Sequence, residues 1–207
     1  MDVTFTKVAG RRYLMTIVRE RGPELAPRQG PGYDGYLPHD AVHCLAESEA
    51  GISGGVFGRI AAGRIAAGHS NIFTTADPTL RRRQARREAK RRPRETEGAD
   101  MARSESLASF CQPLWELRAG HRSELPLWFS SVEPSLLASP LVERIVGRLD
   151  DFAGHWHALP MNSSVTLSWR LSRHGGAPVG GRRSSVAKHA PSLTSQIHAP
   201  HPATKPR

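Results

Sequence analysis

Residues 2–18, DVTFTKVAGRRYLMTIV, decide the fold class. Apolar side chains recur at every second position on both sides of a break at Ala9 and Gly10, and this is the period of a half-buried β-strand. Two such runs joined by a glycine-containing turn predict an antiparallel hairpin. The segment 164–171, SVTLSWRL, has the same alternation and predicts a further strand for the same sheet.

Four segments have the apolar spacing or the end signals of α-helices. The last of them opens with Ser139 and Pro140 and carries apolar residues at helical spacing through Trp156, the clearest amphipathic pattern in the chain. Together with the strands, the helices predict an α+β domain over residues 1–171, in which a small antiparallel sheet packs on helices. The expected helices run from 38 to about 51, from 78 to about 92, from about 97 to 118, and from 140 onward.

The glycine-rich segment 51–70 separates the first two of these helices. It repeats the five residues GRIAA directly, at 58–62 and 63–67, and we interpret it as a loop with a local duplication. Its first part, GISGG, matches the G-x-S-x-G pattern of hydrolase nucleophiles. That pattern requires a strand before the serine and a helix after it. Because a helix is expected before Ser53 and a loop after it, we do not assign this serine a catalytic role.

The formal net charge of +10 is unevenly distributed along the 207 residues. Residues 81–94 hold nine Lys or Arg and one acid, and residues 172–207 hold six Lys or Arg and no acid. The rest of the chain is mildly acidic. Residues 172–207 also lack aromatic side chains and are rich in Pro and Gly, so we expect a disordered basic tail. No secretory or membrane-spanning segment is recognisable, which predicts a cytoplasmic protein without a membrane partner.

Residues 37–51, LPHDAVHCLAESEAG, carry the sharpest chemical signal. His39, His43 and Glu47 follow one another at steps of four residues, which places them about 40° apart in turn on one helix face. Imidazole and carboxylate groups in this arrangement suit one divalent transition metal. Asp40 would then support the ligands from the second shell. The alternative is an ordinary solvated helix face with a favourable pair between His43 and Glu47.

Two resemblances bear on this segment. The element HDAVH, residues 39–43, resembles the HD-x-x-H element of the ubiquinone-biosynthesis accessory family, and the resemblance implies that such a helix can hold metal. In that family a glutamate follows twelve residues after the second histidine, where this chain has Gly55. The blocks 2–43 and 74–92 resemble a family of hypothetical proteins from high-GC bacteria. That resemblance spans residues 1 to about 171 and implies no function.

The arginine-rich helix expected at 78–92 is the second functional candidate. Arginine binds phosphate through two parallel hydrogen bonds, so this helix could lie along a nucleic-acid backbone or on an acidic protein. No aromatic residue is interleaved for base stacking, and sequence-specific recognition is therefore not expected. A solvated helix facing acidic groups of its own domain is the alternative. The residues assigned to partner binding are Arg82, Arg83, Arg86, Arg87, Lys90 and Arg91.

Overall fold

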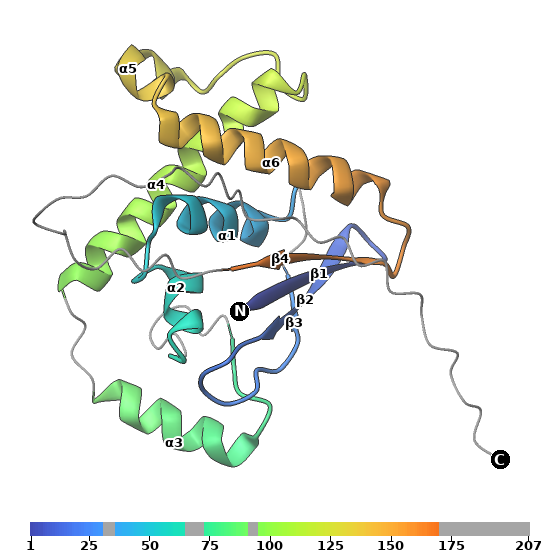
Figure 1. The fold of residues 1–207 in the computed structure, drawn as a ribbon, viewed down its shortest axis with the longest axis vertical. Helices are drawn as coiled ribbons and strands as arrows, with labels where there is room; N and C mark the ends of the chain where they lie inside the picture. Colours follow the sequence, from blue (N-terminus) through green and yellow to red (C-terminus); the bar gives the residue numbers. More distant parts are fainter. Residues whose placement is uncertain (31–35, 65–72, 91–94, 170–207) are drawn as a thin grey trace, which may run out of the picture.

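The structure is a computed structural model that describes residues 1–30, 36–64, 73–90 and 95–169. A four-stranded antiparallel sheet carries helices α1 and α6 over one face, with α4 crossing them (Figure 1). The α+β class predicted from the sequence is thereby confirmed. The predicted tail, 172–207, lies outside the described residues. Over the described residues, no helix combines the length and apolar character needed to cross a membrane.

The strands are β1 (Asp2–Val8), β2 (Arg12–Val18), β3 (Arg28–Gln29) and β4 (Ser164–Ser168), in the spatial order β3-β2-β1-β4. The helices are α1 (His39–Ala50), α2 (Val56–Ala61), α3 (Pro78–Ala89), α4 (Glu95–Arg118), α5 (Pro134–Leu137) and α6 (Pro140–Ala158). A 3-10 helix, η1 (Leu127–Ser131), lies between α4 and α5.

The hairpin predicted at the start of the chain forms the centre of the sheet. Phe5 pairs with Met15 across β1 and β2, and with Val165 across β1 and β4. In the connecting turn, Gly10 and Arg11 have φ values of 74° and 54°, a left-handed conformation that favours glycine. Because Phe5, Met15 and Val165 are paired across three strands, their side chains lie on the same face of the sheet and are buried in one core.

The amphipathic helix α6 covers this apolar face. Its inward residues recur at helical spacing and are buried, and the rings of Phe5 and Phe152 meet edge to face with centroids 5.7 Å apart. Ser139 accepts a hydrogen bond from the backbone N–H of Val142 at 3.3 Å and caps the helix, as its sequence predicts. The opposite sheet face carries paired hydroxyls, such as Thr4 and Thr166 at 2.9 Å.

Two short elements were not predicted. Helix α2 lies inside segment 51–70, so the prediction of a continuous loop there is wrong for residues 56–61. Val56, Phe57 and Ile60 of this helix are buried. Strand β3 is only two residues long and pairs with β2 through Leu14 and Met15. Neither element has enough residues to display a periodic pattern of its own.

Helix α1 positions the candidate site. It begins directly after Pro38, whose ring suits a helix start, and ends at Gly51, which adopts φ 64°. Its apolar residues Ala41, Val42 and Leu45 are buried between α4 and α6. The polar residues of the HDAVH element are therefore fixed at the boundary between core and solvent.

Candidate functional site

The two histidines of HDAVH lie side by side on α1. Their Nε2 atoms are 3.0 Å apart, and their rings meet nearly perpendicularly, with centroids separated by 4.6 Å. His39 is exposed, whereas His43 is only 7% exposed. The sequence expectation that steps of four residues bring these two nitrogens together agrees with this geometry.

A chain of hydrogen bonds continues from His43 into the core. The Nδ1 atom of His43 lies 3.1 Å from the hydroxyl oxygen of Ser104 on α4. That hydroxyl donates to the carboxylate of Glu47 at 2.9 Å. Both Ser104 and Glu47 are completely buried. The chain therefore links an imidazole at the surface to a carboxylate in the interior.

This chain determines which nitrogen of His43 carries the proton. A hydroxyl has one hydrogen, and Ser104 donates it to Glu47. The oxygen of Ser104 can therefore only accept from Nδ1 of His43. In the neutral imidazole, Nε2 is then left with a free lone pair. Burial, followed by the neighbouring charge of His39, lowers the pKa of His43 and favours this neutral form.

Glu47 serves as the N-terminal cap of α2. Its carboxylate accepts hydrogen bonds from the backbone N–H groups of Val56 at 2.8 Å, Phe57 at 2.9 Å and Gly58 at 3.1 Å. Burial raises the pKa of Glu47, and these hydrogen bonds, with that from Ser104, oppose the rise. The structure therefore does not bring Glu47 to the two histidines as a third ligand. It acts on His43 through Ser104 instead.

The glycine at position 55 makes this capping arrangement possible. A Cβ atom on Gly55 would lie 2.4 Å from the carboxylate carbon of Glu47 and 2.5 and 2.6 Å from its oxygens. We expect Gly55→Ala to lower the free energy of unfolding by about 1–3 kcal/mol through overpacking. Gly147→Ala on α6 is the control in urea denaturation, because nothing lies within 4 Å of its added Cβ. Equal midpoints for both variants would contradict the capping role.

Asp40 contacts residues of the sheet. Its carboxylate accepts a short hydrogen bond from the Tyr13 hydroxyl and forms an ion pair with Arg28 at 2.9 Å. Burial and the charge of Asp40 raise the pKa of Tyr13. Through these contacts, Asp40 connects α1 to strands β2 and β3 of the sheet. The described contacts show no hydrogen bond to His39 or His43, so its expected second-shell role has no direct contact in support.

A carboxylate that the sequence analysis missed lies close to the pair. The Oε2 atom of Glu105, on α4, is 3.7 Å from Nε2 of His43, and its side chain is 64% exposed. Glu105 is 62 positions from His43 in the chain, so no spacing rule connects them. Among the described residues, no group of three His, Cys, Asp or Glu side chains is placed to hold a metal ion. The structure brings together the two histidines alone.

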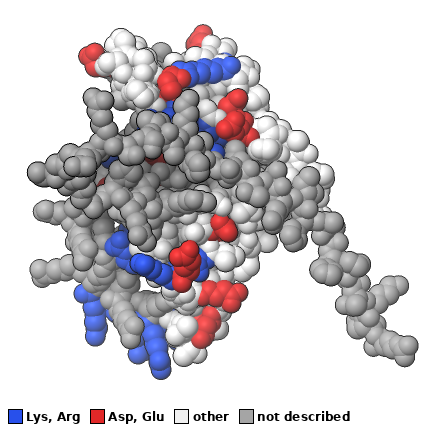
Figure 2. Space-filling model, viewed as in Figure 1, with Lys and Arg blue, Asp and Glu red and all other residues white. Residues whose placement is uncertain are grey.

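The arginine-rich helix is present and exposed. Arg82, Arg83 and Arg86 on α3, and Lys90 just beyond it, have exposed side chains. Figure 2 shows basic side chains at the lower end of the molecule, where α3 lies in Figure 1, with acidic side chains beside them. The side chain of Arg87 and all of Arg91 lie outside the described residues.

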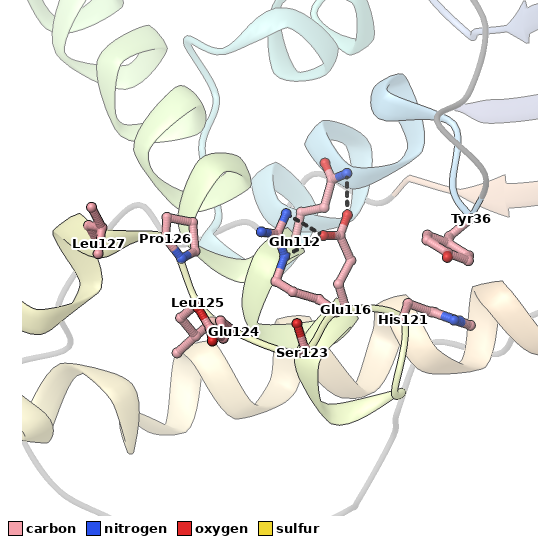
Figure 3. A pocket seen from close by; sticks show the side chains of 10 residues that line it. Tyr36, Gln112, Glu116, His121, Ser123, Glu124, Leu125, Pro126 and Leu127 are labelled. Atoms are coloured by element: carbon pink, nitrogen blue, oxygen red, sulfur yellow. Dashed lines mark hydrogen bonds and ion pairs between the residues drawn. The ribbon is translucent and has the colours of Figure 1, made fainter.

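A cavity of about 710 Å³ lies at the end of α4 (Figure 3). Its central carboxylate, Glu116, accepts hydrogen bonds from Gln112 at 3.0 Å and from Arg122 at 2.9 Å, and its wall includes the stacked rings of Tyr36 and His121. The carboxylate of Glu116 is thus already paired with Gln112 and Arg122. We therefore place the candidate site at the histidine pair, where the Nε2 atoms of His39 and His43 lie together.

Comparison with protein-family models, with curated proteins and with solved structures finds no match to this chain.

Proposed function

We propose that this protein binds one divalent transition metal ion through the Nε2 atoms of His39 and His43. Zinc is the ion we would test first, because imidazole and carboxylate are among its usual ligands and three protein ligands with one water complete its tetrahedral coordination. Glu105 would turn its exposed side chain toward the pair and supply a carboxylate oxygen. The proposed ligand set is thus two histidines and one carboxylate.

One observation carries this proposal: the Nε2 atoms of two histidines lie 3.0 Å apart, beside an exposed carboxylate. Nε2 of His43 is unprotonated when Nδ1 donates to Ser104. A carboxylate oxygen of Glu105 lies 3.7 Å from it, and the negative charge of this group attracts a cation at the pair. In the metal-free protein, Nε2 of His39 can donate its proton to this lone pair of His43 across 3.0 Å. A metal ion would replace it and satisfy all three groups.

The remaining residues would orient the ligands. Metal-bound histidines commonly donate their second N–H to a carboxylate, carbonyl or water, which fixes the ring and strengthens the ligand. Ser104 performs this role for His43, and Glu47 holds Ser104. A metal with three protein ligands retains a position for water or substrate, as catalytic zinc sites do.

The hydrogen bond from His43 to Ser104 gives a specific test. We expect Ser104→Ala to weaken zinc binding roughly 10- to 100-fold, the usual cost of losing a second-shell partner. Ser106→Ala is the matched control, because Ser106 lies two residues away on α4 and its exposed hydroxyl donates to the backbone carbonyl of Ala102. Competition titration of the full-length, untagged protein against a chromophoric chelator measures both affinities. Equal affinities for the two variants would contradict the proposed role of Ser104.

A further inference from the structure

The arginine side chains of this molecule differ in whether they have hydrogen-bond or ion-pair partners within the domain. Two arginines at and just beyond the end of α4 have carboxylate partners from the domain itself: Arg118 binds Glu143 at 2.7 Å, and Arg122 binds Glu116 at 2.9 Å. On α3, Arg81 donates to the carbonyl of Thr75 at 3.1 Å. In the part of the chain that the structure describes, Arg82, Arg83 and Arg86 have no such hydrogen bond or ion pair.

The exposed cations on and next to α3 form a row. Arg82 and Arg86 are one step of four residues apart, and Lys90 follows after another, so the charges are spaced about 6 Å along the helix axis. Arg83 stands beside this row. We name Arg82, Arg83, Arg86 and Lys90 the α3 cation row. The described acidic groups form no ion pair with it, which argues against the solvated helix that faces acids of its own domain.

We infer that the α3 cation row binds the phosphate backbone of a nucleic acid without reading its sequence. The centre of a protein–protein interface is typically apolar. The only large apolar side chain exposed on the described part of α3 is that of Leu80, which is 37% exposed. A nucleic-acid backbone needs no such centre, because displacement of condensed counterions supplies the affinity. Each strand of B-DNA carries a phosphate about every 3.4 Å along the duplex axis, so the row would meet roughly every second one.

The test uses fluorescence anisotropy with a labelled duplex of arbitrary sequence and the full-length protein. The variant is Arg82→Gln/Arg83→Gln/Arg86→Gln. Its charge-matched control is Arg12→Gln/Arg21→Gln/Arg103→Gln, which changes three exposed arginines away from α3. We expect the α3 variant to bind at least roughly tenfold more weakly near 0.1 M salt. The slope of log K against log salt concentration should become less steep by about 2.7, since each lost phosphate contact contributes about 0.9.

The control should keep both affinity and slope close to those of the unmodified protein. Equal losses in the α3 variant and the control would overturn the inference, because net charge rather than α3 would then explain binding. Unchanged binding by the α3 variant would overturn it as well. If the α3 variant loses retention on immobilised polyglutamate but keeps its affinity for the duplex, the partner is an acidic polypeptide and the inference is wrong. Zinc binding plays no part in this experiment, so it stands apart from the metal proposal.

Discussion

Replacing Glu47 by alanine is expected to lower the free energy of unfolding by about 3–5 kcal/mol, the usual cost of stranding buried polar groups without their charged partner. The carboxylate accepts three backbone N–H groups at the start of α2 and the hydroxyl of Ser104. It is completely buried, so water cannot take its place without local opening. Urea denaturation followed by circular dichroism measures the loss.

Two variants make this result interpretable. Glu105→Ala removes the same side chain from an exposed position on α4, and its effect should stay within about 0.5 kcal/mol. Glu47→Gln keeps the size of the side chain but turns an amide N–H₂ toward backbone donors, so we expect a stability between those of Glu47→Ala and the unmodified protein. A Glu47→Ala protein as stable as Glu105→Ala would show that the capping contacts contribute nothing.

The double variant His39→Ala/His43→Ala is expected to lose one equivalent of bound metal. These two nitrogens are the preformed part of the proposed site, and Glu105 alone cannot hold a divalent ion against water. Cobalt(II) offers a direct readout, because its visible absorption reports nitrogen ligands in a site of low coordination number. The unmodified protein should develop this absorption up to one equivalent, and the double variant should not.

Other histidines require a matched control. The chain has 10 histidines in total, and several could bind cobalt weakly. His155→Ala changes an exposed histidine on α6 and should leave the one-equivalent signal intact. Identical spectra for the double variant and the His155→Ala variant would mean that the HDAVH element is ordinary helix surface.

The sequence predicts those parts of the fold whose signals are local. The hairpin follows from strict alternation around Gly10, and α6 follows from its cap at Ser139 and its apolar spacing. Helix α2 has neither kind of signal. Its N-terminal cap is the carboxylate of Glu47, nine to eleven residues earlier, so its stability depends on a contact between elements rather than on its own residues.

Likewise, only some contacts of the candidate site can be predicted from the sequence. The pairing of His39 with His43 follows from helical spacing, and the structure agrees with it. Helical spacing does not predict where the Glu47 carboxylate binds, because it accepts hydrogen bonds from the backbone N–H groups of α2 and not from the histidines. Ser104 and Glu105 come from α4, about 60 positions further along the chain. Only the packing of α4 against α1 reveals them.

The most direct test of the metal proposal is anomalous diffraction from crystals of the zinc-loaded protein, recorded on both sides of the zinc absorption edge. We predict one strong peak about 2.0–2.1 Å from Nε2 of His39 and of His43, with a Glu105 oxygen as third protein ligand. Glu47 should still cap α2. A zinc peak on Glu47, or none at the two histidines in crystals that contain zinc elsewhere, would contradict the account.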